Sequence, residues 1–342
     1  MTELAPSPSD HADPAFIEVG TDNGHAAVLG GLTVLERVIR AQAKLGVTRV
    51  VVAAEPIVVD AGGVPHGVAV EWTPGGKPAA GQAVVRGDEI HGIRVVDADT
   101  RKRAEWAVFQ SLPKGHQGPT DAYINCHFSL RISRQLAKTS ITPNAITIAA
   151  TVWGLIACAI ALGATYTHVA IAGVMLQFHN IFDSCDGEIA RLKYKFTKIG
   201  AWLDNILDEV VDNSFIAVMG IVAGGIWMPI GVAAAAMRLA SNALQWVEQY
   251  RLTGSGSASA FRFWFESHEA KPEEIWDRAS LSYWLRALGR RDTYCLMFMI
   301  FCLAGQPGLV GAYAFLPALV TFVLMMLHLL LRGRQAPPAS IN

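Results

Sequence analysis

The chain has 342 residues, of which 52% are hydrophobic and 17% charged, with a mean hydropathy of +0.32. This composition is too apolar for an ordinary soluble protein and is typical of a membrane protein with a soluble part. The net charge of −1 gives no indication of nucleic-acid binding. The five cysteines form no CxxC pair, so neither a disulfide framework nor a zinc site is indicated.

The N-terminal third predicts a soluble α/β domain. Residues 1–15 are polar and proline-rich, which predicts a disordered tail rather than a signal peptide. Within the domain, residues 16–115, the stretch GLTVLERVIRAQAKLGVTRVVVAAEP predicts an amphipathic helix and then a strand. A continuous valine run of this kind is typical of a strand buried in a parallel sheet. Further strands are predicted at 67–72, 83–87 and 93–99, and a helix at 100–112.

A linker with one amphipathic helix follows, residues 116–143. Its helix, residues 128–140, alternates apolar side chains with Arg131, Arg134 and Lys138. This composition favours a helix that lies at the membrane surface, although an ordinary amphipathic surface helix has the same pattern.

Residues 144–333 predict a bundle of six transmembrane helices, with a polar loop at 253–288 and a tail at 334–342. The predicted spans are 144–163, 166–190, 199–225, 227–250, 291–306 and 308–331. Three short links carry no Lys or Arg, whereas the other connections do, and positive charge favours the cytoplasmic side. We therefore expect a multi-pass protein of the cell (inner) membrane, with both termini, the α/β domain and the acidic segment on the cytoplasmic side.

Four aspartates stand at regular spacing where the second span ends and the third begins. Residues three or four apart share a helix face, so Asp183 and Asp186 form one stripe and Asp204 and Asp208 another. The link between the two helices is short, which makes them antiparallel neighbours and lets the four carboxylates converge. Clustered carboxylates repel one another unless cations separate them, and Mg²⁺ or Mn²⁺ prefer such oxygen ligands. The pattern predicts a site for two divalent ions.

Small residues and one arginine accompany these aspartates. Gly187, Ala190 and Gly200 remove side-chain bulk beside the carboxylates, so that a nucleotide can approach helix backbone. Arg191 can neutralise a phosphate or pair with a carboxylate.

The full spacing, D-x2-D-G-x2-A-R-x8-G-x3-D-x3-D over residues 183–208, resembles the signature of the CDP-alcohol phosphotransferase (CDP-alcohol phosphatidyltransferase) family. These are integral membrane enzymes that cleave a CDP-alcohol and pass its phosphoalcohol group to a hydroxyl. The segment ITPNAIT, residues 141–147, is similar to the family's entry into the first span. An acidic cluster in a solvated loop would not require this spacing.

The resemblance implies roles for individual residues. Asp183, Asp186, Asp204 and Asp208 would hold two divalent ions, and Asp208 would also be the general base. The CDP site would be formed by Asp183, Gly187, Ala190, Arg191, Gly200, Thr142 and Pro143. The substrates would be a CDP-alcohol, of the CDP-diacylglycerol or CDP-inositol type, and an acceptor hydroxyl, for which an inositol phosphate is one candidate. CMP would be released. Membrane lipids would surround the protein, which would be a homodimer.

The α/β region resembles sugar-nucleotidyltransferase domains, which the bifunctional inositol-phosphate cytidylyltransferase and di-myo-inositol phosphate phosphate synthase group fuses to the membrane transferase. A Gly-rich nucleotide loop with a following lysine is absent near its start, where EVGTDNGHAAVLGG stands instead. We expect a truncated domain without nucleotidyltransferase activity. The rival function class is a membrane cation transporter or channel, which would explain intramembrane acids but not the glycines and arginine at fixed spacing.

Three basic residues are candidates for acceptor binding: Lys198, Arg238 and Arg291. Arg238 lies in the middle of the fourth span and must face the bundle, where it either binds an acceptor phosphate or pairs with an acidic residue such as Asp212. The segment 290–292 begins the fifth span, and membrane-surface anchoring of its arginines competes with acceptor binding. The histidines His168, His179 and His328 are interpreted as packing residues.

Overall fold

The computed structural model describes residues 15–20, 22–56, 68–79, 82, 84–112, 118–253 and 287–331. The predicted tails, apart from Ala15, and nearly all of the predicted 253–288 loop lie outside these residues. The described residues fall into two compact units that divide near residue 113, except that 134–139 group with the first.

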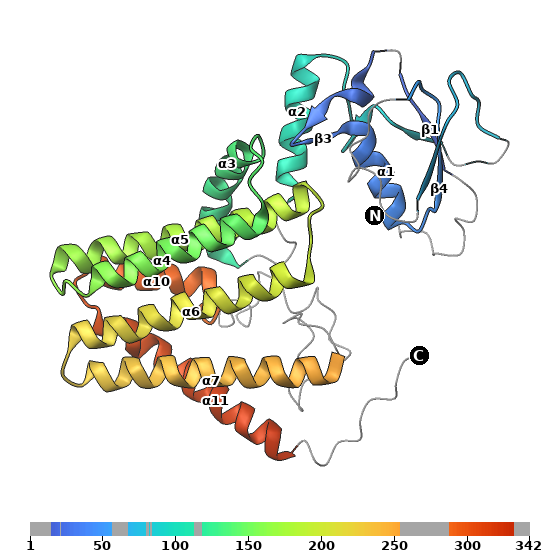
Figure 1. Ribbon diagram of the computed structural model, residues 1–342. Coiled ribbons are helices and arrows are strands. Elements are labelled where there is room, and N and C mark those ends of the chain that lie inside the picture. The colour runs from blue at the N-terminus through green and yellow to red at the C-terminus, as the bar shows by residue number, and fades with distance from the viewer. Residues whose placement is uncertain are drawn as a thin grey trace. The chain divides into compact units, whose positions relative to one another are not determined.

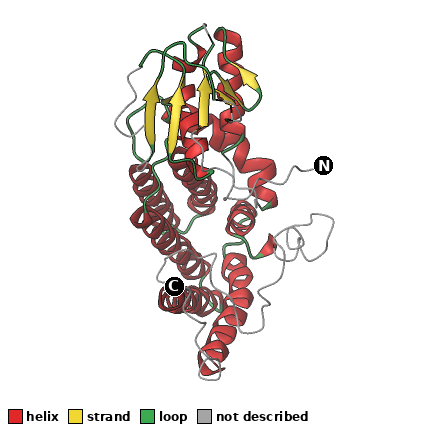
Figure 2. Ribbon diagram, turned by 90° about the vertical axis from the view of Figure 1, so that its right-hand side faces the viewer, coloured by secondary structure: helices red, strands yellow, loops and turns green. Residues whose placement is uncertain are grey.

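The first unit contains a parallel four-stranded sheet with the order β5-β4-β1-β6 (Figure 2). The valine-rich strand is confirmed as β4, and the predicted parallel sheet is confirmed with it. The central strand β1 was not predicted, because its few residues directly follow the polar tail. The strands of this sheet are β1 (Ala15–Glu18), β4 (Arg49–Val52), β5 (Ala69–Trp72) and β6 (Val84–Arg86).

Two short antiparallel pairs and two helices complete this unit. The pairs are β2 (Val28–Leu29) with β3 (Leu32–Thr33) and β7 (Glu89–Ile90) with β8 (Ile93–Arg94); a 3₁₀ turn, η2 (Gly24–Ala26), precedes the first pair. The helices are α1 (Val34–Lys44) and α2 (Ala98–Gln110).

Helix capping sets the start of both helices, which the sequence predicted at other residues: Leu32 was counted in the first helix, and the second was expected to begin at residue 100. Thr33 and Glu36 form a capping box that starts α1, so Leu32 belongs to a strand and not to the helix. Asp97 accepts hydrogen bonds from the backbone of Asp99 and Thr100 and starts α2. The predicted strand at 93–99 therefore stops at Arg94.

The second unit is entirely helical within its described residues (Figure 1). A π-helical turn, η3 (Asp121–Asn125), leads into α3 (Cys126–Leu136). The six predicted spans correspond to six helices, of which α4 and α11 are long and apolar enough to cross a membrane. The six are α4 (Pro143–Ala161), α5 (Tyr166–Leu192), α6 (Lys198–Ala223), α7 (Trp227–Thr253), α10 (Arg291–Leu303) and α11 (Gly308–Leu331).

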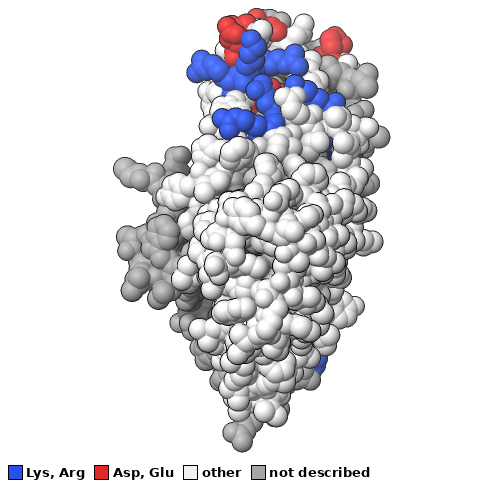
Figure 3. All heavy atoms as spheres, turned by 90° about the vertical axis from the view of Figure 1, so that its left-hand side faces the viewer, with Lys and Arg blue, Asp and Glu red and all other residues white. Residues whose placement is uncertain are grey.

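The core of this unit is apolar, with Phe215, Met219 and Phe298 among its fully buried side chains. Gly231 of α7 lies against both α6 and α11, because a Cβ built on it would be 2.8 Å from the Cα of Gly220, and one built on Gly311 would be 2.9 Å from the Cα of Gly231. Figure 3 shows one face of the molecule, and most of the surface drawn there carries no Lys, Arg, Asp or Glu. An uncharged surface of this extent is compatible with lipid.

Candidate active site

The hairpin of α5 and α6 brings the two halves of the aspartate pattern together. Helix α5 ends at Leu192, and the short link after it contains Tyr194 in the left-handed region, at φ 54°. Helix α6 then begins beside Thr197, whose hydroxyl accepts a hydrogen bond from the Gly200 amide over 2.9 Å. The reversal brings the aspartate-bearing end of α5 near the start of α6. The prediction that the two helices are packed antiparallel neighbours is wrong along their length, because α4 packs against both of them.

Three of the four aspartates form a compact group. Carboxylate oxygens of Asp183, Asp186 and Asp204 lie within 4.8 Å of one another. The Oδ1 atoms of Asp183 and Asp204 are buried and have no hydrogen-bond partner among the described residues. Asp186 accepts a hydrogen bond from the hydroxyl of Thr147 on α4. Orphaned carboxylate oxygens facing one point are the donor set that a divalent cation prefers, so these residues fit the predicted metal.

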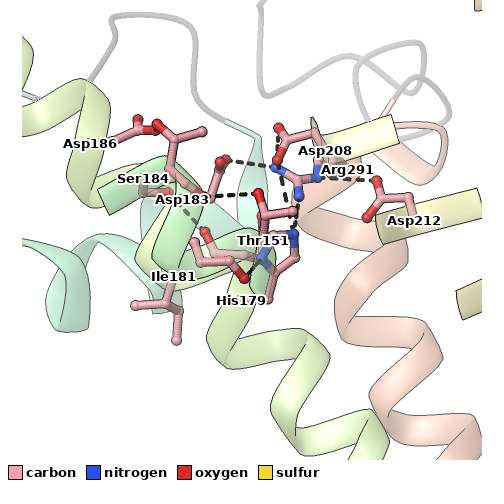
Figure 4. Close-up of polar contacts among 12 residues, drawn as sticks. Thr151, His179, Ile181, Asp183, Ser184, Asp186, Asp208, Asp212 and Arg291 are labelled. Carbon is pink, nitrogen blue, oxygen red and sulfur yellow. Dashed lines mark hydrogen bonds and ion pairs between the residues drawn. The ribbon is translucent and has the colours of Figure 1, made fainter. Parts of the chain in front are cut away.

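Asp208 points into the same site but pairs with Arg291 of α10 (Figure 4). Nη1 of Arg291 donates to Asp208 Oδ2 over 2.5 Å and to Asp183 Oδ2 over 2.6 Å. Nη2 of Arg291 lies 2.8 Å from Nε2 of His179. One guanidinium group thus partly neutralises two of the four predicted ligands.

One interpretation from the sequence is wrong here and a second is incomplete. Arg291 is not a membrane-surface anchor, since its side chain pairs with Asp183, Asp208 and the buried Asp212. His179 packs, but it also belongs to the site: Nδ1 lies 2.9 Å from the carbonyl oxygen of Ala150, and Nε2 lies 3.9 Å from Asp208. The contact of Arg291 with Asp208 could not be read from spacing, because the two residues are about 80 positions apart along the chain.

A cavity of about 160 Å³ adjoins the aspartate group. A Cβ on Gly200 would lie 2.8 Å from Oδ1 of Asn144, so glycine keeps this wall open. Thr142 caps α4 through a hydrogen bond from the amide of Ala145 and does not itself line the cavity. The predicted nucleotide residues that line it are Pro143, Gly187, Ala190, Arg191 and Gly200, and the sequence analysis missed Asn144 and Thr147, which also line it.

A larger cavity, of about 390 Å³, is lined by Asp208. Arg238 and Arg291 both line it, together with polar side chains of α7 and apolar ones of α11. Arg238 donates to the hydroxyl of Tyr294 over 2.9 Å and to Glu209 over 3.4 Å, while Asp212 is 3.9 Å away. The alternative that Arg238 pairs with acids is therefore confirmed, and acceptor binding by Arg238 stays a prediction. The side chain of Lys198 lies outside the described part of the structure.

Residues 140–332, more than half of the chain, match the model of the CDP-alcohol phosphatidyltransferase family. The chain is 27% identical over 221 residues to the bifunctional IPC transferase and DIPP synthase of Aquifex aeolicus, covering 64% of this chain and 46% of that protein. It is 34% identical over 137 residues to the protein of the same name from Archaeoglobus fulgidus, covering 39% of this chain and 27% of that protein. It is 35% identical over 100 residues to the archaetidylinositol phosphate synthase of Pyrococcus horikoshii (28% and 48%). The match spans less than half the length of each of these relatives.

Proposed function

Because the chain belongs to the CDP-alcohol phosphatidyltransferase family, we propose that it moves a phosphoalcohol group from a CDP-alcohol to an acceptor hydroxyl and releases CMP. The reaction class is that of a transferase of substituted phosphate groups. In the proposed step the acceptor oxygen bonds to the phosphorus that carries the alcohol. The bond from that phosphorus to CMP breaks, and the acceptor proton leaves to a base.

The aspartates divide between metal binding and base catalysis in this proposal. Asp183, Asp186 and Asp204 hold divalent ions, Mg²⁺ or Mn²⁺, with Asp208 as a further ligand of a second ion. Such ions supply positive charge beside the diphosphate and the departing CMP. Asp208 takes the acceptor proton, since it alone of the four lines the larger cavity.

The two cavities support separate places for donor and acceptor. The smaller one adjoins the metal aspartates, and its glycine walls and Arg191 fit the cytidine and phosphates of the CDP group. The larger one carries two guanidinium groups beside Asp208, which fits an acceptor that bears a phosphate. Since several relatives are named for inositol phosphate products, we propose an inositol phosphate as acceptor and a CDP-diacylglycerol or CDP-inositol type donor.

The membrane arrangement is part of the proposal. We propose that the six helices of residues 144–333 form a membrane-embedded bundle of six spans, in which α10 has only 13 residues in the structure. We place residues 16–115 and the aspartates on the cytoplasmic side, with 116–143 as linker. Membrane insertion is supported by α4 and α11, which are long and apolar enough to cross a bilayer, and by the largely uncharged surface in Figure 3. The homodimer rests on the family resemblance alone. The transporter alternative loses its support, because the family match covers the whole aspartate pattern.

The observation that carries the proposal is the convergence of Asp183, Asp186 and Asp204. Asp186 and Asp204 line the smaller cavity, and Asp208 lines the larger one. The test is CMP release by the purified full-length protein with Mg²⁺, using CDP-diacylglycerol and CDP-inositol as donors. Inositol and inositol 1-phosphate serve as paired acceptors. We expect CMP release that requires an acceptor and is faster with the phosphorylated one. An equal rate with unphosphorylated inositol would contradict the assignment of the arginine cavity.

A further inference from the structure

Behind the larger cavity lies a buried acid that the aspartate signature does not include. Asp212 stands one helical turn beyond Asp208 on α6, is 1% exposed, and is not among the residues that line the cavity. Its Oδ2 atom accepts a hydrogen bond from the hydroxyl of Tyr294 over 2.5 Å and one from Nε of Arg291 over 3.1 Å. Both donors do line the cavity, so Asp212 supports its wall from the protein side.

The contact with Arg291 uses a donor that the other acids leave free. Nη1 of Arg291 serves Asp183 and Asp208, whereas Nε faces Asp212 (Figure 4). If Asp183 and Asp208 coordinate cations, the Nη1 hydrogen bonds compete with metal ligation, but the Nε hydrogen bond uses no oxygen of either residue. Asp212 can therefore hold the guanidinium group beside the cavity while the metal aspartates are engaged.

The contact with Tyr294 extends the same support to Arg238. The tyrosine hydroxyl has one proton, which it donates to Asp212, and its lone pair accepts from Nη2 of Arg238 over 2.9 Å. The guanidinium carbon of Arg238 also lies 4.7 Å from the centroid of the Tyr294 ring. Asp212 thereby fixes the direction of the hydroxyl on which Arg238 rests.

We propose that Asp212 is a positioning residue for acceptor recognition: through Tyr294 and Nε of Arg291 it holds two guanidinium groups toward one phosphate in the larger cavity. This inference rests on the proposed function for the identity of the acceptor, but the phosphate site itself does not. Hydrogen bonds run from Arg238 through Tyr294 to Asp212, and from Arg291 to the same oxygen of Asp212. They hold the two guanidinium groups in one preorganised arrangement. Loss of the Asp212 charge should weaken phosphate binding without touching the CDP side.

Binding of inorganic phosphate to the full-length protein with Mg²⁺ tests this directly. Asp212→Asn keeps size and removes charge, and we expect its phosphate affinity to fall about tenfold, which corresponds to one lost charge-assisted interaction. Tyr294→Phe should have a similar effect, and the double variant should add little, because both act through one chain of contacts. Arg238→Gln shows where the phosphate binds. Phosphate bound in the larger cavity should lose affinity in this variant, whereas phosphate bound only at the metal ions should keep it.

The matched control is Glu248→Gln on α7. Glu248 is also buried, at 2% exposed, and pairs with an arginine, Arg251 at 3.6 Å, but does not line the cavity. Wild-type phosphate affinity in Asp212→Asn, or equal losses in Asp212→Asn and Glu248→Gln, would overturn the proposal even if CMP release is normal.

Steady-state kinetics give the second readout. In Asp212→Asn the acceptor KM should rise about tenfold while the KM for the CDP-alcohol stays unchanged. A purely structural role predicts instead a lower melting temperature and a lower kcat with both KM values unchanged, which would contradict a positioning role. Failure of the wild-type protein to release CMP from any CDP-alcohol would refute the proposed function, while the phosphate isotherms would still decide the role of Asp212.

Discussion

At the scale of single residues, the account separates metal binding from base catalysis. Asp208→Asn keeps the size of the side chain but cannot take a proton, so we expect transfer to fall about 10²-fold or more with nearly normal binding of CDP-alcohol. Asp183 is one of the three aspartates that could hold a metal ion, so Asp183→Asn should weaken Mn²⁺ binding and nucleotide binding together. Isothermal titration and CMP release on both variants make the comparison. Near-normal turnover in Asp208→Asn would show that the proton leaves by another route.

A second residue-scale prediction concerns Asp121, in the turn before α3. Burial, with the nearby carboxylate of Asp292, raises the pKa of Asp121 to about 6, although Asn125 and Arg290 oppose the shift and Asp183 adds to it. A raised folded-state pKa stabilises the docked turn fully below about pH 4, and this contribution is lost as pH rises through about 6. Hydrogen exchange at residues 118–125, corrected for intrinsic rates, should therefore show stronger protection at pH 5 than at pH 7.

Asp121→Asn is the matched variant for that experiment, since its neutral side chain resembles the protonated acid. In the parent protein Nδ2 of Asn125 donates to Asp121 Oδ1 over 2.7 Å, and the amide oxygen of the variant can accept the same hydrogen bond. Protection of residues 118–125 should become independent of pH between 5 and 7. An unchanged pH dependence in this variant would assign the effect to another group.

Much of the site could be predicted from sequence because its spacing is local. The eight signature positions lie within one hairpin, and helical periodicity alone places Asp183 with Asp186 and Asp204 with Asp208. Arg291, Tyr294 and His179 could not be placed in the same way, because their contacts depend on how α10 packs against α5 and α6. A charged residue at the start of an apolar helix has no sequence signal that distinguishes an anchor from an inward-facing group.

At the scale of elements, helix packing depends on glycines in three neighbouring helices. A Cβ on Gly231 would lie 2.8 Å from the Cα of Gly220 and 3.0 Å from the carbonyl oxygen of Ile216, and neither backbone atom can move alone. Gly231→Ala should therefore destabilise the bundle by about 1–3 kcal/mol, as overpacking typically does. Thermal unfolding in detergent measures this, with exposed Ala236→Val on the same helix as control. Equal melting temperatures for the two variants would contradict the close packing.

Elements were easiest to predict where they are long and apolar. Each of the six predicted spans overlaps one helix, whereas the α/β unit was predicted less well. Strand β1 has four residues and gains its stability from two neighbours, β4 and β6, which lie far away in sequence. The strand expected at 93–99 gave way to α2 because the side chain of Asp97 caps the helix.

At the scale of the whole molecule, the family match covers residues 140–332 and leaves the α/β unit outside it. We expect the full-length protein not to form a CDP-alcohol from CTP, because the segment after β1, VGTDNGHAA, offers no glycine-rich phosphate loop with a following lysine. Pyrophosphate release from CTP with inositol 1-phosphate is the measurement. Release that persists in Asp183→Asn would place a second active centre in the α/β unit.

The central claim is that convergent aspartates transfer a phosphoalcohol group with the help of divalent ions. The most direct measurement is CMP release from a CDP-alcohol by the purified full-length protein, in excess EDTA and after Mg²⁺ or Mn²⁺ is restored. The account predicts no CMP release in EDTA and recovery with either ion, because the carboxylates of Asp183, Asp186 and Asp204 need cations to bind a diphosphate between them. Full turnover in EDTA would contradict it.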